Sequence, residues 1–401
     1  MIIYARCVTN VPAGRREREL APRRDGRLRP QDSRPSGRRA PDDVRTEFDS
    51  GHTTGQVLLL APSQGLGGGI ERYLETIEWA FHLRRIGSRR INLERPGYLG
   101  HLKMFLDGRK ALKDIGEPAR IIVGHRALLP VATLLARQAV VRGVSIVCHG
   151  SEVWGSRWRP RRIAERWLMR RSDVRVIAVS SFTAGSLAGD CMATVLAPGL
   201  SQDWFDVLVG AARDRRDSAP RAKLVTVFRL ASWREKGLPE LMSAIEALRD
   251  DSIRLTVCGS GEPPADLLKF VSDRQWCVLR HNMSDHELAR ELASADLFVL
   301  ATRTRSGRRA SGEGFGMVIM EAQVAGIPVV VPAYGGVADA YIDGVTGIAP
   351  SEETTAALSR TLAEMLADRR RLAWMAERAG EWARLTFAPE RYADVACRRL
   401  L

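Results

Sequence analysis

Short apolar runs alternate with helical patterns along most of this 401-residue chain, and this alternation is what most constrains its fold. The first run, QVLLLAP (56–62), precedes a glycine-rich turn and then IERYLETIEWAFHL (70–83), whose apolar residues have helical spacing. Three further runs of strand type follow: ARIIVGH (119–125), VSIVCHG (144–150) and VRVIAVS (174–180). Strands that are apolar throughout and separated by helices predict a parallel sheet covered on both faces.

The same pattern starts again after GAARDRRDSAPRAK (210–223), a polar stretch that we interpret as a linker. Five more runs read as buried strands: LVTVFRLA (224–231), RLTVCGSG (254–261), WCVLRHN (276–282), DLFVLAT (296–302) and IPVVVPA (327–333). Helical stretches between them include LPELMSAIEALR (238–249) and DHELARELASA (285–295). The sequence therefore predicts an α/β protein with two Rossmann-like, doubly wound domains, 55–215 and 216–387. Ligands of such sheets bind beyond the carboxyl ends of the strands, here in a cleft between the domains.

The two ends of the chain differ from this pattern. Residues 1–54 are rich in Arg, Pro, Asp and Ser without periodic apolar spacing, so we expect a disordered tail. The closing segment APERYADVACRRLL (388–401) is amphipathic, and we expect a helix that packs back across the domain junction.

Composition favours a cytoplasmic protein. No run approaches the roughly 20 apolar residues that span a bilayer, and the first apolar run does not read as a secretory signal. The six cysteines form no CxxC pair, so reduced thiols are expected.

The net charge of +14 is unevenly distributed. Residues 56–215 hold 24 lysines and arginines against 14 acids, whereas residues 216–401 hold 25 of each. Such a surface suits nucleic acid, anionic lipid or a phosphorylated substrate, and simple solubilisation is the alternative. No nucleic-acid-binding motif appears, which leaves a nucleic-acid-binding protein as a less favoured hypothesis.

The segment GSRWRPRRIAERWLMRRS (155–172) carries seven arginines together with Trp158, Trp167 and Leu168. A helix of this composition can lie on an anionic membrane surface. We therefore expect peripheral contact with the cytoplasmic leaflet, the alternative being a solvated helix with its tryptophans in the core.

Two glutamates mark the candidate site in GEGFGMVIMEA (312–322): Glu313 and Glu321, eight positions apart. If Gly314–Gly316 form the turn into a helix, the amides of Phe315, Gly316 and Met317 are free to bind diphosphate or sugar oxygens. Helical rise separates the glutamates by roughly 12 Å, comparable to the span from a sugar to a ribose across a diphosphate. The alternative is a capping Glu313 and a buried, paired Glu321.

Cations and a glycine loop accompany these acids. Arg229 lies near the end of a predicted strand and Lys236 follows it, and such a pair suits a diphosphate leaving group. In GLGGG (65–69), Gly68 allows close backbone approach to a ligand, although neither GxGxxG nor GxxxxGK[ST] is present. His149 lies at a strand end, where a hydrogen-bonded structural role is the alternative. No metal-ligand cluster or Ser-His-Asp arrangement can be assembled.

Taken together, these residues resemble the family 4 glycosyltransferases, retaining enzymes of the GT-B fold. The resemblance spans roughly residues 56–400 and is most specific in EGFGMVIMEAQVAGIPVVVPAYGGVADAYIDGVTG (313–347), which is similar to the family's E-x7-E block and its GG and DG-x-TG elements. FRLASWREKG (228–237) resembles the family's diphosphate motif, with Phe228 in place of a glycine. LTVCGSG, ADLFVLAT, GGGIERYL, CHGSEVW, AVSSFTA and LAPGLSQDWF are also similar to family segments.

The resemblance implies a role for each candidate residue. Glu313 would stabilise the oxocarbenium-like transition state, Glu321 would hold the ribose hydroxyls, and Arg229 and Lys236 would neutralise the departing β-phosphate. The remaining contacts to the donor would come from the amides of Phe315, Gly316 and Met317, from Gly68 at the diphosphate and from His149 at the sugar. The implied reaction is a retaining, metal-independent transfer without cofactor from a UDP- or GDP-linked sugar to a hydroxyl.

The acceptor is less well defined by the resemblance. The loop TRTRSGRRASGEGFG (302–316) is long and basic, similar to loops of enzymes that act on lipid-linked acceptors. Four arginines could hold a phosphorylated acceptor, a solvated loop being the alternative: Arg303, Arg305, Arg308 and Arg309. Polysaccharide, glycolipid and antibiotic glycoside synthesis all remain open, and a GT-B nucleotide-sugar epimerase or hydrolase is the closest enzymatic alternative.

Overall fold

The computed structural model describes residues 56–62, 68–154, 160–214, 222–305 and 310–401. The chain divides into two units, Met1–Gly51 and His52–Leu401, and every described residue belongs to the second. Predictions for the tail 1–54, for most of the glycine loop at 65–69, and for Trp158, Arg308 and Arg309 lie outside the described residues.

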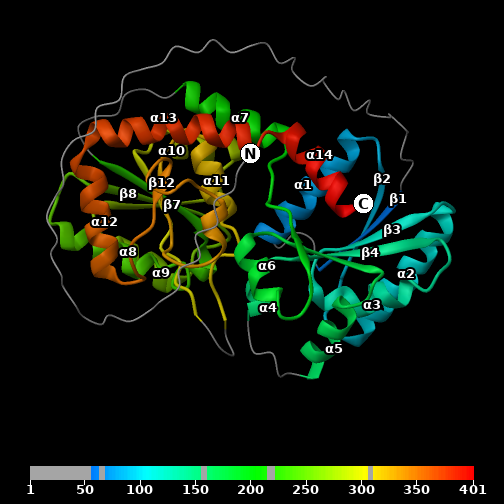
Figure 1. Cartoon of the computed structure of the whole chain (residues 1–401). Coiled ribbons are helices and arrows are strands. Elements are labelled where there is room, and N and C mark those ends of the chain that lie inside the picture. The colour runs from blue at the N-terminus through cyan, green and yellow to red at the C-terminus, as the bar shows by residue number, and fades with distance from the viewer. Residues whose placement is uncertain (1–55, 63–67, 155–159, 215–221, 306–309) are drawn as a thin grey trace, which may run out of the picture. The chain divides into compact units, whose positions relative to one another are not determined.

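Two six-stranded sheets form the framework, and every pairing between their strands is parallel (Figure 1). The first sheet has the order β2-β1-β3-β4-β5-β6 and comprises β1 (Gln56–Ala61), β2 (Gly87–Asn92), β3 (Ala119–Val123), β4 (Val141–Cys148), β5 (Val174–Ala178) and β6 (Ala193–Val195). The second has the order β12-β11-β10-β7-β8-β9 and comprises β7 (Lys223–Arg229), β8 (Arg254–Ser260), β9 (Cys277–His281), β10 (Leu297–Val299), β11 (Val329–Val330) and β12 (Gly347–Ile348). The predicted α/β class with two parallel sheets is confirmed.

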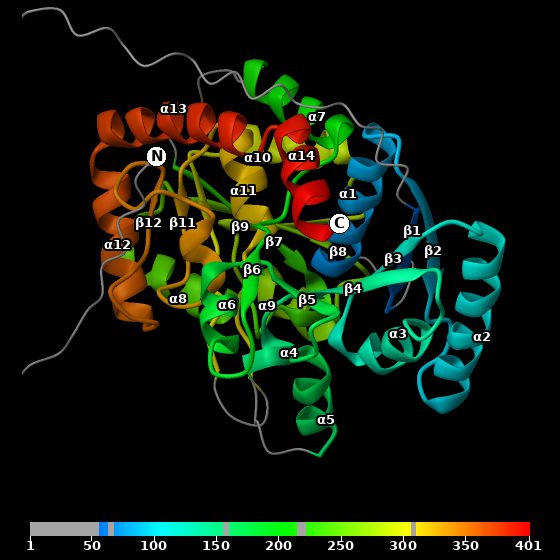
Figure 2. The same ribbon diagram turned by 45° about the vertical axis from the view of Figure 1, so that its right-hand side comes forward.

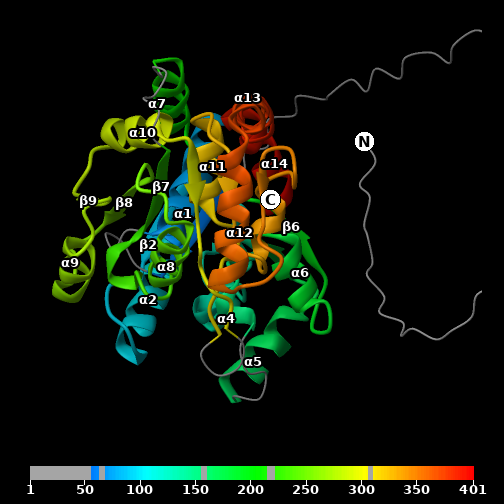
Figure 3. The same ribbon diagram turned by 90° about the vertical axis from the view of Figure 1, so that its left-hand side faces the viewer.

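Helices cover both faces of the sheets, as the fully apolar strands require. Those that follow strands of the first sheet are α1 (Gly69–Leu83), α2 (Tyr98–Ile115), α3 (Leu129–Leu135), α4 (Ser151–Trp154), α5 (Pro160–Met169), α6 (Ser181–Leu187) and α7 (Gln202–Arg213), with a 3₁₀ turn η1 at Arg126–Leu128. Those of the second are α8 (Leu238–Leu248), α9 (Ala265–Ser272), α10 (Asp285–Ser294), α11 (Met317–Val324), α12 (Thr355–Ala367) and α13 (Arg369–Thr386), with 3₁₀ turns η2 (Leu230–Ser232) and η4 (Gly336–Asp339). In Figure 3, α10 lies above β7–β9, and α8 and α9 lie below them.

The linker prediction was partly wrong. It began at residue 210, but α7 continues to Arg213, because Gly210, Ala211 and Ala212 extend the helix whose apolar face includes Trp204 and Leu208. The rest of the predicted linker, apart from Asp214, Ala222 and Lys223, lies outside the described residues.

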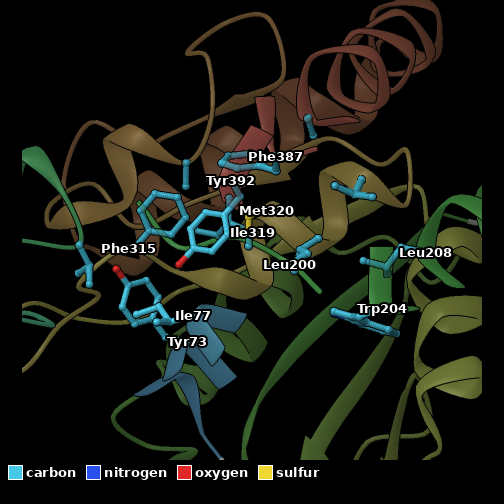
Figure 4. Close-up of a cluster of buried hydrophobic side chains, with 14 of the residues drawn as sticks. Tyr73, Ile77, Leu200, Trp204, Leu208, Phe315, Ile319, Met320, Phe387 and Tyr392 are labelled. Atoms are coloured by element: carbon cyan, nitrogen blue, oxygen red, sulfur yellow. The ribbon is translucent and has the colours of Figure 1, made fainter. Parts of the chain in front are cut away.

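One hydrophobic cluster includes elements of both sheets. Figure 4 shows Tyr73 and Ile77 of α1, Trp204 of α7, and Phe315 and Ile319 among its members. The last helix, α14 (Pro389–Leu400), adds Tyr392 and lies beside α1 (Figures 1 and 2). The segment 313–320 is therefore packed against helices that belong to the first sheet.

Gly199 shows how close this packing is. A Cβ on Gly199 would come within 2.2 Å of the Tyr392 ring, so only glycine lets α14 approach the chain there.

Candidate active site

Glu313 is held by two side chains from neighbouring loops. Lys236 donates from Nζ to Glu313 Oε1 at 2.6 Å, and Thr302 donates from Oγ1 to the same oxygen at 2.7 Å. The Glu313 side chain is only 12% exposed. The structure thus brings together Lys236 and Glu313, which were predicted from separate motifs. It adds Thr302, the last residue of the run DLFVLAT, which was not predicted from the sequence.

Gly237 explains why these loops meet. Its φ of +72° is left-handed, and a Cβ there would lie 1.9 Å from the carbonyl oxygen of Ala301. The loop after β7 therefore packs directly on the loop after β10, and glycine is needed both for the conformation and for the contact. This contact places Lys236 next to Thr302 and Glu313.

The glycines around Glu313 are also close-approach positions. A Cβ on Gly314 would come within 1.8 Å of the His149 carbonyl oxygen, and one on Gly336 would come equally close to the Gly314 carbonyl. Gly336 donates its amide to the Glu313 carbonyl at 2.8 Å. Three loops therefore meet at the backbone of residues 313–314, which fixes the direction of the Glu313 side chain.

Helix α11 begins at Met317 after Gly316, whose φ is +83°. Among the described residues, the amides of Phe315, Gly316 and Met317 have no hydrogen-bond partner. They form the positive end of the α11 dipole, and this end is where an anion binds to a helix. Phe315 itself is buried, so it can contribute to a site only through its backbone.

Glu321 lies within α11 and is paired. Its side chain is 1% exposed, and Oε1 accepts from Arg72 Nη1 of α1 at 3.1 Å. The Glu321 carboxylate raises the pKa of Arg72, and the guanidinium also lies 5.9 Å from the centre of the Trp204 ring. Arg72 was not predicted from the sequence. The only feature that could have indicated it is its position about one helical turn after the glycine loop.

Gly68 and Arg229, both predicted to contact the donor, lie against each other. A Cβ on Gly68 would lie 2.2 Å from Arg229 Nη2, so the guanidinium rests on the glycine backbone. A Cβ on the next residue, Gly69, would be in ordinary contact with Met317 Sδ at 3.9 Å. The end of the glycine loop therefore lies between Arg229 and the start of α11.

His149 is held in one orientation at the end of β4. Its Nε2 donates to the Gly124 carbonyl at 2.8 Å, and its ring lies edge-on to Tyr73 with centroids 5.4 Å apart. Burial lowers the pKa of His149, more than the nearby Glu152 carboxylate raises it. The imidazole is therefore favoured in its neutral form beside the Gly314 loop.

Two of the arginines in the basic loop can be placed. Arg303 pairs with Glu240 of α8 at 3.1 Å, and the next amide, of Thr304, donates to Glu353 at 2.7 Å. Arg305 is exposed and pairs in an antiparallel bridge with Ser311. The base of the loop is thus anchored toward α8 and the segment before α12.

The predicted membrane-facing segment is partly helical. In α5, Trp167 is 65% exposed, so this tryptophan is not in the core, whereas Leu168 packs against the hydrophobic cluster of the first sheet. Within the described ranges, no helix is both long and apolar enough to cross a bilayer. In the same part of the chain, no three His, Cys, Asp or Glu side chains are grouped so that they could hold a metal ion.

Comparisons with known proteins place the chain in a family. Residues 213–382 match the family described as glycosyl transferases group 1. The chain is 31% identical over 283 residues to the GDP-mannose-dependent alpha-(1-6)-phosphatidylinositol monomannoside mannosyltransferase of Mycolicibacterium smegmatis, covering 67% of this chain and 73% of the relative. It is 30% identical over 232 residues to a glycogen synthase of Mycobacterium tuberculosis, covering 55% of this chain and 52% of that one.

A solved structure shares the fold. HepE of Anabaena in complex with UDP superposes with a TM-score of 0.67 at 18% identity, covering 86% of this chain and 99% of that one. Three observations agree on the same kind of protein: the two parallel six-stranded sheets, the glycine-packed loops around Glu313 and the match to the mannosyltransferase. The chain belongs to the glycosyl transferases group 1 family, and it is a glycosyltransferase of the GT-B fold.

Proposed function

We propose that this enzyme transfers a mannosyl group from GDP-mannose to a hydroxyl of a phosphatidylinositol-linked acceptor, with retention of the anomeric configuration and without a metal ion. The observation that carries the proposal is the cluster of Glu313 with Lys236 and Thr302 at the start of α11. The choice of donor and acceptor is supported by the relative from Mycolicibacterium smegmatis, whose name specifies both.

The diphosphate of the donor fits the cationic side of the site. Arg229 is the last residue of β7 and Lys236 lies in the loop that follows, and the amides of Phe315, Gly316 and Met317 lie at the start of α11. Oxygens held by a guanidinium, an ammonium and a helix N-terminus are stabilised as charge builds up on the leaving group. Gly68, packed on Arg229, lets the backbone after β1 come close to the same phosphates.

Glu313 acts on the sugar. Its carboxylate stabilises the positive charge that develops at the anomeric carbon, and Lys236 holds that carboxylate in place until the β-phosphate competes for the ammonium. The departing diphosphate takes the proton of the acceptor hydroxyl as the new bond forms on the same face of the sugar. The anomeric configuration is thereby retained without a covalent glycosyl-enzyme.

Glu321 and His149 position the donor. Glu321 accepts hydrogen bonds from the ribose hydroxyls, with Arg72 orienting one of its oxygens. His149, fixed by the Gly124 carbonyl, orients the sugar beside the Gly314 backbone.

Exposed apolar residues on α2 support peripheral contact with a membrane. Tyr98 is 96%, Leu99 81%, Leu102 54% and Leu106 55% exposed, and Leu99, Leu102 and Leu106 have the spacing of one helical face. Lysines and arginines lie on the same helix: Lys103, Arg109, Lys110 and Lys113. An amphipathic helix of this kind lies in the headgroup region, where each cation contributes about 1 kcal/mol on anionic lipid. A lipid-linked acceptor would then be presented from the cytoplasmic leaflet.

The test is a transfer assay with lipid acceptors in vesicles. The enzyme is given GDP-mannose, UDP-glucose or ADP-glucose, with phosphatidylinositol or its monomannoside as acceptor and with or without EDTA. We expect a mannosylated lipid from GDP-mannose only, an α linkage by NMR, and no loss of rate with EDTA. Free mannose or an epimerised nucleotide sugar as the sole product would contradict transfer and favour the hydrolase or epimerase alternative.

A further inference from the structure

Three arginines lie at the amino ends of adjacent strands in the first sheet. Arg120 is the second residue of β3, Arg142 the second of β4 and Arg175 the second of β5. They line an open pocket of about 360 Å³ whose other lining residues are Ser172, Asp173, Val174, Val176, Met192 and Thr194. Small-molecule sites commonly enclose roughly 300–1,000 Å³.

Strand register places two of these arginines on one face. Arg120 is opposite Gly143 and Arg175 is opposite Ser145, and residues two apart on β4 point to the same side. Gly143 leaves the space between them open, since a Cβ there would lie 3.2 Å from Arg120 Nη1. The two guanidinium groups therefore flank a hollow above β4.

The positive charge of this pocket is not compensated. Its one acidic lining residue, Asp173, accepts with both oxygens from Arg171 at 2.9 Å. None of the three pocket arginines pairs with a carboxylate in the described part of the chain. Burial and the charge of Arg175 both lower the pKa of Arg120. The fold therefore holds the two guanidinium groups near each other although their positive charges repel.

Packing against α14 accounts for only part of this arrangement. Arg175 Nη1 donates to the Arg399 carbonyl at 3.1 Å, and Ser145 Oγ donates to the Leu400 carbonyl at 2.7 Å. Arg120 has one hydrogen-bond partner among the described residues, and the bond is long: Nη1 donates to Ser145 Oγ at 3.5 Å. The last turn of α14 thus accepts one hydrogen bond from Arg175. The other N–H donors of the Arg175 and Arg120 guanidinium groups remain available for a ligand.

We propose that Arg120, Arg142 and Arg175 form a second anion site, which binds the phosphate group of a phosphate monoester. Guanidinium groups bind phosphate oxygens through paired hydrogen bonds, and three cations more than neutralise the charge of about −2 that such a group carries. The pocket has room for an attached organic group, such as the sugar of a sugar phosphate.

This site is distinct from the donor site. Arg120 is four residues before Gly124, whose carbonyl holds His149, and four residues of strand span about 13 Å. The arginines lie at the amino ends of strands whose carboxyl ends face the catalytic loops. The proposal does not depend on the identity of the sugar donor.

Ligand binding separates the two sites. Thermal unfolding is followed with inorganic phosphate and with glucose 6-phosphate, against sodium chloride of equal ionic strength. The variant Arg229→Gln/Lys236→Gln serves as background, because it removes both cations of the proposed donor site and so weakens phosphate binding there. Arg120→Gln and Arg175→Gln are then added singly, and Arg89→Gln is the control, since Arg89 pairs with Asp114 outside the pocket.

In the donor-site background we expect a saturable rise of the unfolding midpoint with phosphate and with glucose 6-phosphate. Arg120→Gln and Arg175→Gln each weaken this binding by roughly tenfold or more, as expected when a charge-assisted hydrogen bond is lost, and Arg89→Gln does not. Equal responses in all variants, or none in the background, would overturn the proposal. If Arg120→Gln fails to fold, Arg120→Lys and the exposed Arg142→Gln are used in its place.

A second arm identifies the source of the phosphate. Binding to vesicles that carry a phosphorylated phosphatidylinositol is compared with binding to vesicles of phosphatidylinositol alone. Saturable stabilisation by glucose 6-phosphate without arginine-dependent vesicle binding assigns the site to a small metabolite. Arginine-dependent binding to the phosphorylated vesicles, and not to vesicles of phosphatidylinositol alone, assigns it to a lipid headgroup. The absence of both the stabilisation by glucose 6-phosphate and the arginine-dependent vesicle binding would contradict a phosphate site.

Discussion

At the scale of single residues, the contact between Lys236 and Glu313 is where the proposed mechanism can be tested most directly. Glu313→Gln keeps the size of the side chain and its bond to Thr302, but it removes the negative charge that stabilises the transition state in the proposed mechanism. We expect kcat to fall by about 10²–10³-fold with a much smaller change in donor affinity, as for the loss of one electrostatic group in a preorganised site.

Steady-state rates and donor binding by calorimetry test this expectation. Thr302→Val is the matched control, because it removes one hydrogen bond to the same oxygen and leaves both charges. A Glu313→Gln enzyme with wild-type kcat would show that the carboxylate only supports the loop.

His149 gives a prediction about pH. Burial holds its pKa below the ordinary value of 6.5, so the unfolded chain binds a proton at a pH where the folded chain does not. Its contribution to the free energy of unfolding is therefore complete above pH 6.5 and is lost as the pH falls from there toward the folded-state pKa. Wild type should lose more stability than His149→Gln between about pH 7.5 and about pH 5.5.

Urea unfolding at the two pH values measures the difference directly. His82→Gln, at an exposed position of α1, is the control and should follow wild type. If His149→Gln lost as much stability on acidification as wild type does, the imidazole would not be held neutral by the fold.

At the scale of elements, Gly237 offers a test of how the site is assembled. Gly237→Ala places a methyl group against the Ala301 carbonyl and strains a left-handed residue, so the Lys236 loop must move away from Glu313. Gly344 has a similar φ of +73°, but a Cβ at Gly344 would meet no other atom within 4 Å. Gly344→Ala should cost only the backbone penalty of about 1–2 kcal/mol, whereas Gly237→Ala should cost more and also lower kcat.

The comparison of these two alanine variants by urea unfolding and by transfer rate separates conformational cost from displacement of the site. Equal losses of stability with full activity in both would show that the loop adapts without moving Lys236.

The elements also show what could be predicted from the sequence. Central strands such as β1, β3 and β7 are buried on both faces, so their residues are apolar runs that stand out. The strands that were missed, β2, β6 and β12, all lie at sheet edges. β2 has the sequence GSRRIN and is half exposed, so it carries no apolar run to find. Similarly, the apolar run 327–333 contains only two residues of β11, because periodicity does not locate the ends of a strand.

At the scale of the whole described chain, contacts between elements of the two sheets lay beyond sequence reasoning. Arg72 of α1 pairs with Glu321 of α11, and Ser181 at the start of α6 donates from Oγ to Asp339 of η4 at 2.6 Å. The motif indicated Glu321, but its partner lies 249 residues away, on a helix face that reads as solvated. Only the packing of the two sheets' helices brings such residues together.

The Arg72–Glu321 pair therefore gives a prediction about coupling between these elements. Arg72→Met leaves the buried Glu321 carboxylate without its cation and should destabilise the fold, and Glu321→Gln should weaken donor binding as well as stability. In the double variant no charge is left unpaired, so part of the lost stability should return. We expect a coupling energy of about 0.5–3 kcal/mol from a double-mutant cycle in urea. The value should lie near the lower end of this range, because Arg72 is 44% exposed and solvent weakens its interaction with Glu321. Strictly additive losses would mean that the two side chains contribute independently, and α1 and α11 would then be held together by their hydrophobic contacts alone.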